Sequence, residues 1–112
     1  MGVIAPKRGE VWWINFEPHQ GSEVNKLRPA VVVSNNIANK YLDRFQVVPL
    51  TSNIDRVYPG ECIVSLKKQD GKAMSNQIMT VSKIRFGKRI QKLSADDVQL
   101  LDSALRVQLS LP

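Results

Sequence analysis

The sequence contains little of what a metal centre or a disulfide framework needs. Its 112 residues include one cysteine, Cys62, and one histidine, His19. A single cysteine excludes an internal disulfide and agrees with a reducing compartment. Because the carboxylates are scattered, no metal-ligand spacing is present, and no glycine-rich loop of the phosphate-binding type occurs. We therefore expect no metal and no cofactor. Any chemistry must come from arginine, lysine, acidic or hydroxyl side chains.

Long apolar runs are absent too. No stretch approaches the roughly 20 apolar residues that a membrane-spanning helix needs. Residues 1–8 hold no apolar run of the signal-peptide type. These two absences predict a cytoplasmic protein that does not enter a membrane.

What is present is the composition of a basic, globular protein. Hydrophobic residues make up 43% of the chain, which is ordinary for a globular protein, and the length predicts a single domain over residues 1–112. The 16 lysines and arginines exceed the 10 acidic residues and give a net charge of +6. This charge favours a polyanionic partner, nucleic acid first, although a merely basic surface is the simpler alternative.

Hydrophobic patterning predicts a mainly β fold. Runs of bulky or β-branched residues predict strands at residues 11–16, 30–33, 45–50, 61–66 and about 74–82. The dipeptide Asp70-Gly71 is a strong hairpin-turn signal and should connect the last two strands. The lysines around it, Lys67, Lys68 and Lys72, would then be solvated side chains near the hairpin tip.

Two helices complete the expected fold. Ser34-Asn35-Asn36 can cap a short helix that runs through about Leu42. The segment from Ser94 to Asp97 resembles a capping box with aspartate in place of glutamate. Apolar residues then recur at helical spacing: Val98, Leu101, Ala104 and Leu105. We expect an α+β architecture, mainly β with a C-terminal helix, in which a small curved antiparallel sheet or SH3-like barrel carries that helix.

Two polar segments carry the candidate chemistry. The first, from Gly21 to Pro29, places Glu23 and Arg28 in or beside an exposed loop, and the proline holds Arg28 extended. The second, residues 48–53, places hydroxyl and amide side chains at the end of an apolar strand, where a rigid scaffold can present them to a ligand. Taken alone, a solvated loop and an ordinary strand-to-turn exit explain these segments more simply.

Taken together with other motifs, these segments resemble the MazF/PemK/Kid-type toxins of bacterial toxin–antitoxin pairs. Each motif is weak alone, whereas the ordered set is fairly specific and covers most of the chain. The motifs are Lys7-Arg8-Gly9-Glu10-Val11-Trp12, Gly21-Ser22-Glu23, Arg28-Pro29, Val31-Val32-Val33-Ser34, Asn39, Val48-Pro49-Leu50-Thr51-Ser52, Tyr58-Pro59-Gly60-Glu61, Gln77-Ile78, Lys83-Ile84-Arg85 and Leu93-Ser94.

The resemblance implies an activity and partners. Members of the family are sequence-selective, metal-independent endoribonucleases that cut single-stranded RNA. They form homodimers on a barrel-like sheet, and an antitoxin with an acidic, flexible tail blocks them. A chain with a net charge of +6 fits such a partner.

The resemblance also assigns catalytic roles. Arg28 matches the family's catalytic arginine, whose fork of donors suits phosphate oxygens. Because a guanidinium keeps its proton, charge stabilisation is its first role. Thr51 matches the catalytic threonine, which can donate to the same phosphate. Glu23 matches a loop glutamate of several relatives and is the candidate general base.

Further residues are expected to bind RNA, with plain structural roles as the alternative: His19, Ser22, Ser52, Asn53 and Gln77. Trp12 and Trp13 are expected in the core or in a dimer contact rather than stacked on bases. Some relatives have aspartate where this chain has Asn76, and arginine where it has Met74 or Met79. We therefore expect no acid–base scheme through that aspartate.

Two other function classes remain open. A toxin of similar fold that binds and poisons DNA gyrase would not need Arg28 and Thr51, so their joint presence argues against it. A non-catalytic, nucleic-acid-binding barrel would spread aromatic residues over an open sheet face. Aromatic residues are only 6% of this chain, which weakens that alternative.

Overall fold

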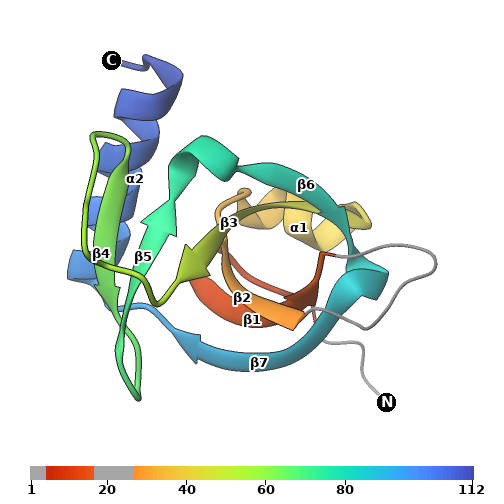
Figure 1. Cartoon of the computed structure of the whole chain (residues 1–112). Coiled ribbons are helices and arrows are strands. Elements are labelled where there is room, and N and C mark those ends of the chain that lie inside the picture. The colour runs from red at the N-terminus through yellow and green to blue at the C-terminus, as the bar shows by residue number, and fades with distance from the viewer. Residues whose placement is uncertain (1–4, 17–26) are drawn as a thin grey trace.

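The computed structural model describes residues 5–16 and 27–112 of the chain. These residues form seven strands, two α-helices and two 3-10 helices (Figure 1). In chain order they are β1 (Glu10–Asn15), β2 (Leu27–Val32), α1 (Asn36–Tyr41), β3 (Arg44–Thr51), β4 (Glu61–Ser65), β5 (Asp70–Met74), η1 (Ser75–Gln77), β6 (Met79–Ser82), η2 (Lys83–Arg85), β7 (Phe86–Lys92) and α2 (Ala95–Leu109). The prediction of a mainly β fold with a C-terminal helix is confirmed.

The strands form one antiparallel sheet in the order β4-β5-β3-β2-β1-β7, and β6 pairs with β3 outside this path. In Figure 1, strands β7, β1, β2, β3 and β6 follow a ring, which is the small barrel that we expected, while β4, β5 and α2 lie to one side. The first half of β3 pairs with β6, and its last two residues pair with β5. β3 therefore belongs to both parts of the sheet.

The sheet is buried on both faces because successive side chains of a strand point to opposite sides. One set fills the inside of the ring: Trp12, Ile14, Ala30, Val32, Phe45, Val47 and Val81. The other set packs with α2 and the β4–β5 hairpin: Val11, Val31, Val33, Val48, Leu50, Cys62, Val64, Ala73, Leu93, Leu101, Ala104 and Leu105. The continuous apolar run at residues 30–33 thus has a core on each side, as predicted.

The short helix predicted after Ser34 is α1. Asn35 is its N-cap, and the Asn35 side chain accepts a hydrogen bond from the Ala38 backbone N–H at 2.8 Å. The buried side chain of Asn39 donates to the Ser34 carbonyl at 2.9 Å, which ties the helix to the end of β2. Leu42 is extended and leads into β3.

The hairpin turn predicted at Asp70-Gly71 is wrong. Both residues belong to β5, where Asp70 pairs with Ser65 and Gly71 pairs with Val64. The chain turns earlier, over residues 66–69, and the Leu66 N–H donates to the Gln69 carbonyl at 3.2 Å. Gly71 provides space instead of a turn, because a Cβ atom there would lie 3.1 Å from a Leu66 methyl carbon.

The single strand predicted over residues 74–82 is also wrong, because η1 separates β5 from β6. β5 pairs with the end of β3, whereas β6 pairs with its beginning, over Arg44–Val47. The short helix moves the chain from one pairing position to the other. The alternation of apolar and polar residues in the sequence does not show where a strand stops pairing with one part of β3 and starts pairing with another.

The sequence pattern predicts no strand over residues 86–92, where the structure has β7. These residues are mostly polar and exposed, so hydrophobic alternation is weak. Pairing with β1 defines the strand, and its register shifts on both sides of Trp12. Such bulges increase twist and bend, which helps a short sheet to curve into a ring.

The terminal helix α2 begins as predicted. Ser94 is its N-cap, and the Ser94 hydroxyl accepts a hydrogen bond from the Asp97 N–H at 3.1 Å. The Asp97 carboxylate accepts from the Ser65 N–H at 2.8 Å, so it joins the helix to β4 instead of completing a capping box. Among the described residues, no helix is long and apolar enough to cross a membrane.

Candidate active site

Arg28 and Thr51 lie at the same end of two neighbouring strands. β2 and β3 are antiparallel, with Ala30 opposite Pro49 and Val31 opposite Val48. The observed pairs end at Ala30 and Pro49, and extending the same register by two residues would set Arg28 level with Thr51. Opposite residues of an antiparallel pair share a face, with Cβ atoms about 4.5–5.5 Å apart. The fold therefore places these two residues, which come from separate sequence motifs, at the same end of the β2–β3 pair.

The Arg28 side chain is available to a ligand. It is exposed, and Ile14 lies opposite it on β1. Within residues 5–16 and 27–112, the cations of the ion pairs are Arg8, Lys72 and Arg89, and none of these pairs uses Arg28. A guanidinium without a carboxylate on its fork can direct two parallel donors at phosphate oxygens.

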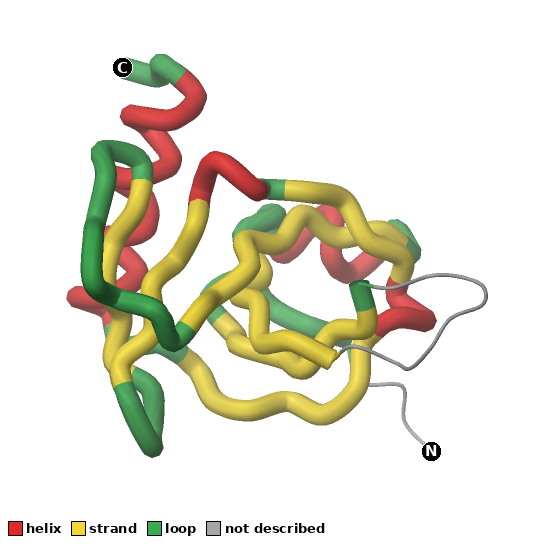
Figure 2. Tube along the Cα trace, viewed as in Figure 1, coloured by secondary structure: helices red, strands yellow, loops and turns green. Residues whose placement is uncertain are grey.

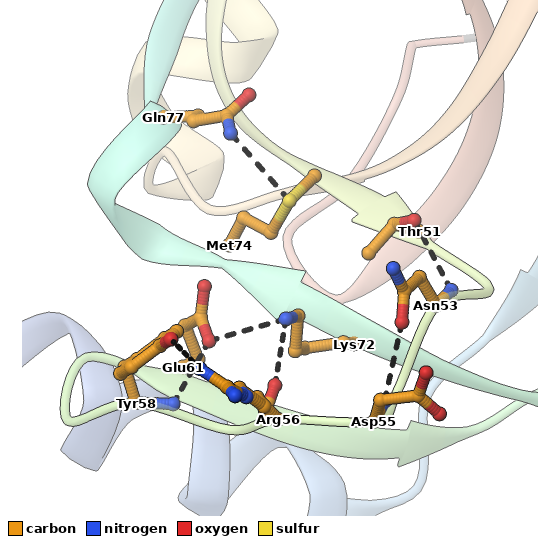
Figure 3. A network of polar contacts seen from close by, with 9 residues as sticks. All are labelled: Thr51, Asn53, Asp55, Arg56, Tyr58, Glu61, Lys72, Met74 and Gln77. Carbon is orange, nitrogen blue, oxygen red and sulfur yellow. Dashed lines mark hydrogen bonds and ion pairs between the residues drawn. The ribbon is translucent and has the colours of Figure 1, made fainter.

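Thr51 is half-buried, and the backbone that follows it orients its hydroxyl. The Asn53 N–H donates to the Thr51 Oγ1 atom at 3.2 Å (Figure 3). Because this bond uses the oxygen as an acceptor, it does not consume the hydroxyl proton, which can be donated to a ligand. The Asn53 side chain in turn accepts from the Asp55 N–H at 3.2 Å, which forms a local turn.

A cavity of about 170 Å³ opens beside Thr51. It is lined by Trp13, Pro29, Leu50, Thr51, Ser52, Leu66, Gln69, Asp70 and Gly71. Trp13 is 40% exposed, whereas Trp12 is buried and packs edge to face against Phe86, with ring centroids 5.6 Å apart. Trp12 is thus in the core as expected, while Trp13 offers an aromatic surface next to Ser52.

Gln77 lies in η1, and its side-chain amide donates to the Met74 sulfur at 3.6 Å (Figure 3). It is exposed, like Asn76 and Met79. Among the described residues, the side-chain amide of Gln77 therefore makes only this weak contact, and it is accessible to an RNA nucleobase. Three other residues predicted for the site, His19, Ser22 and Glu23, lie outside the described residues.

The structure adds a buried ion pair that the sequence reasoning missed. The Lys72 Nζ atom lies 3.3 Å from the Glu61 carboxylate and 2.8 Å from the Arg56 carbonyl oxygen. Lys72 is only 9% exposed, so its prediction as a solvated residue near a hairpin tip is wrong. The error follows from placing the turn at Asp70-Gly71. Once the turn moves to residues 66–69, Lys72 is an interior position of β5.

Two alternative chemistries, one that uses a protein-bound metal ion and one that uses a cysteine nucleophile, find no support in the described residues. They contain no group of three histidine, cysteine, aspartate or glutamate side chains placed to hold a metal ion. Cys62 is the free cysteine, and it is buried in the core. Its burial, with a further contribution from the charge of Asp97, raises the pKa of the thiol to about 11. The thiol is therefore protonated at neutral pH and is a poor nucleophile.

Known proteins resemble this chain over most of its length. A model of the family described as PemK-like, MazF-like toxin of type II toxin–antitoxin system matches residues 7–109. The chain belongs to this toxin family. Among curated proteins, it is similar to Endoribonuclease MazF9 of Mycobacterium tuberculosis (strain ATCC 25618 / H37Rv), with 40% identity over 114 residues, 94% of this chain and 97% of that protein.

Solved structures share the fold of this MazF/PemK-like toxin. A mycobacterial endoribonuclease in complex with its cognate antitoxin has a TM-score of 0.83 and 24% identity, covering 96% of this chain and 98% of that one. MazF (Form-I) from Deinococcus radiodurans has a TM-score of 0.80 and 24% identity, covering 97% of this chain and 100% of that one. The expected barrel with a terminal helix is thus the fold of this group.

Proposed function

We propose that this toxin is a metal-independent endoribonuclease that cuts single-stranded RNA at a site built on Arg28 and Thr51. One observation carries the proposal. Arg28, which forms no ion pair with the described residues, and Thr51, whose oxygen accepts from the Asn53 N–H, lie at the same end of the paired strands β2 and β3. This pair occurs in a chain that is 40% identical to a protein named as an endoribonuclease.

The reaction needs only groups of this kind. The 2′-oxygen of the RNA attacks the adjacent phosphorus, a bond forms between them, and the bond from phosphorus to the 5′-oxygen breaks. The products are a 2′,3′-cyclic phosphate and a 5′-hydroxyl. One proton leaves the 2′-hydroxyl and one reaches the departing 5′-oxygen. Arg28 offsets the charge that develops on the phosphorane, and the Thr51 hydroxyl donates to one of its oxygens.

The remaining candidate residues have roles in proton transfer and recognition. Glu23 is our candidate for the general base, because a carboxylate can take the proton of the 2′-hydroxyl. Ser52 and Asn53, which follow Thr51, and Gln77 in η1 offer exposed polar groups, and His19 and Ser22 precede β2 in the sequence. Together they are the proposed contacts that select the RNA sequence.

The proposed partners follow from the family. The mycobacterial relative in complex with its cognate antitoxin suggests that an antitoxin also binds this chain, through an acidic, flexible tail that meets its charge of +6. We further propose that the toxin is a homodimer and acts in the cytoplasm, where its RNA substrate is found.

One gel assay tests the activity. Purified toxin is incubated in EDTA with each of three substrates in separate reactions. These are a long single-stranded RNA, a single-stranded DNA of the same sequence, and a short RNA whose 2′-hydroxyl at the cut position is replaced by hydrogen. We expect cleavage of the ribose substrate alone. Cutting of the deoxy substrate, or loss of cutting in EDTA, would refute the mechanism. RNA binding without cleavage would support a non-catalytic barrel, and inhibition of gyrase without RNA cleavage would support a gyrase poison.

A further inference from the structure

The buried Lys72–Glu61 pair lies on the same row of the sheet as the candidate site. Lys72 of β5 is directly opposite Thr51 of β3 in the antiparallel ladder. Extending the register of β3 with β2 two residues beyond the Ala30–Pro49 pair would set Arg28 on the other side of Thr51. Opposite residues share a face, so Lys72 and Thr51 lie on one face of the sheet, at the end of the β2–β3 pair that also carries Arg28. Lys72 is therefore a direct neighbour of the proposed catalytic threonine.

The ammonium group of Lys72 joins three segments of the chain. It extends from β5, contacts the Glu61 carboxylate at the start of β4, and donates to the Arg56 carbonyl in the loop between β3 and β4 (Figure 3). Glu61 makes a second contact with this loop, because it accepts a hydrogen bond from the Tyr58 N–H at 2.9 Å. The Lys72 and Glu61 side chains are 11% and 10% exposed.

The loop that they hold carries recognition and catalytic groups. Residues 52–60 connect β3 to β4 without regular secondary structure (Figure 2). At the start of the loop, the Asn53 N–H fixes the Thr51 hydroxyl, and Ser52 lines the cavity beside it. Its middle is fixed by Lys72 at Arg56, and its end by Glu61 at Tyr58. The buried pair therefore stabilises both the middle and the end of the loop whose first residues touch Thr51.

We infer that Lys72 is a positioning residue for RNA cleavage: with Glu61 it fixes the 52–60 loop and thereby the Thr51 hydroxyl and its neighbours Ser52 and Asn53. This inference rests on the proposed function. A contribution to folding alone is a poor explanation for a charged pair in this place, since an apolar pair of similar volume often stabilises a protein as well or better. The pair is instead suited to fixing a loop that has few apolar contacts of its own.

The test separates positioning from stability by means of a charge-free pair. In the double variant Lys72→Met with Glu61→Gln, both charges are removed, and the glutamine can still accept from the Tyr58 N–H. The contact with the Arg56 carbonyl is lost. Lys68→Met is the matched control, because Lys68 is an exposed lysine of the same hairpin. For each protein we would measure thermal melting, single-turnover cleavage over a range of RNA concentrations, and amide hydrogen exchange.

We expect the double variant to melt close to the parent and to cleave saturating RNA about tenfold to a hundredfold more slowly, because small displacements of catalytic groups cost rates of this size. The RNA concentration for half-saturation should change by no more than about threefold, since the cationic surface is otherwise intact. The amides of Asn53 and Arg56 should exchange faster. Lys68→Met should match the parent in all three measurements.

Two further variants make the result decisive. Lys72→Arg keeps a cation that can reach both acceptors and should recover part of the rate. Lys72→Met alone leaves Glu61 charged, buried and without its cation, so it should lower the melting temperature more than the double variant does. If the double variant fails to fold, Lys72→Arg must show normal melting with a reduced rate, and a parent-like rate there would overturn the inference.

The outcomes also distinguish this inference from the proposed function. If the parent toxin cuts no RNA, the proposed function is wrong and the positioning role is wrong with it. If the parent cuts RNA and the folded double variant cuts it at the parent rate, only the positioning role is wrong. A rate that falls merely in proportion to the unfolded fraction would likewise overturn it.

Discussion

In the proposed mechanism, Arg28 contributes charge and Thr51 contributes a hydrogen bond. Arg28 is exposed near the start of β2, so its side chain contributes little to the core. Thr51 is the last residue of β3, and its hydroxyl is oriented by the Asn53 N–H. Backbone pairing of β2 and β3 positions both residues, and other residues of the same two strands are buried in the core. Changes to their side chains should therefore affect activity far more than stability.

Arg28→Ala should remove most of the activity and leave the fold intact. A contact to charge that develops in the transition state is worth about 2.7–4 kcal/mol, or roughly a hundred- to a thousandfold in rate. Arg28→Lys keeps the charge and loses the bidentate fork, so partial recovery would indicate charge stabilisation alone, while a rate like that of alanine would indicate that two phosphate oxygens must be aligned. Single-turnover cleavage of a short RNA measures both.

Arg44→Ala is the control for Arg28, because it removes another exposed arginine at the start of a strand. It should cut RNA at the parent rate. If Arg28→Ala melts like the parent and cuts within a factor of a few of it, the assignment of the site to Arg28 is wrong.

Thr51→Val should slow cleavage about tenfold to a hundredfold, and Thr51→Ser should retain most of the activity. Valine has the shape of threonine without the hydroxyl, so it removes the donor to the phosphate and the acceptor for the Asn53 N–H together. Serine keeps both. Rates at saturating RNA for the two variants decide the matter, and equal rates for valine and serine would show that the hydroxyl takes no part.

Among the elements, β1 and β7 are joined by a carboxylate that makes stability depend on pH. Glu10 accepts hydrogen bonds from the Lys7 N–H at 2.9 Å, the Trp12 indole at 3.0 Å and Arg89 at 3.0 Å. Burial alone would raise the pKa of the Glu10 carboxyl, but these three hydrogen bonds and the charge of Arg89 outweigh it and lower the pKa below 4.5. The carboxylate thus favours the folded state whenever it is ionised.

Glu10→Gln should therefore lower the melting temperature at neutral pH and change its dependence on acid. Because the folded pKa is depressed, the stabilising contribution of Glu10 is present above the ordinary value of 4.5 and is lost as the pH falls through the folded pKa. The gap in melting temperature between parent and variant should close on acidification below that value. Asp43→Asn, at an exposed position, serves as the control. A gap that stays constant down to about pH 3 would contradict this role.

The helix α2 offers a test of stability that leaves the site unchanged. Ser94→Ala removes the N-cap acceptor for the Asp97 N–H and should cost about 1 kcal/mol of unfolding free energy. For a domain of this size, the melting temperature should fall by roughly 4–8 °C. Ser103→Ala, in the exposed interior of the same helix, should cause no loss because alanine favours helix. Since α2 carries no proposed site residue, both variants should cut RNA normally well below their melting temperatures.

At the scale of the whole molecule, apolar side chains remain uncovered. Several large ones are half or more exposed, among them Leu100, Val107 and Leu111 in or after α2, and Ile37 and Tyr41 in α1. Such side chains are available to pack against a second chain, as the proposed homodimer requires. The proposed homodimer should give, by light scattering, about twice the 12.6 kDa monomer mass. A clean monomer at micromolar concentration would exclude the dimer.

Local features of the sequence were enough to predict several elements. Bulky β-formers predicted β1, β3 and β4, and the apolar run at residues 30–33 predicted a strand buried on both faces. The caps Asn35 and Ser94 act through contacts only three residues away, so each is visible in the sequence. Arg28 and Thr51 were assigned to one candidate site from family motifs. That these residues carry the chemistry remains a prediction.

Other features depended on contacts between distant residues. β7 is polar and exists because it pairs with β1, and the break at η1 arises because β5 and β6 pair with different parts of β3. The Lys72–Glu61 pair joins neighbouring strands of a hairpin whose turn, at residues 66–69, comes just before the Asp70-Gly71 signal. Sequence periodicity reports which face of a strand is apolar, but only the register of paired strands decides which charges meet. For this protein, the sequence by itself determined the strands and helices that depend on nearby residues, such as capped helices and runs of β-forming residues. Pairing between distant strands decided how the ring closes and which residues surround Thr51.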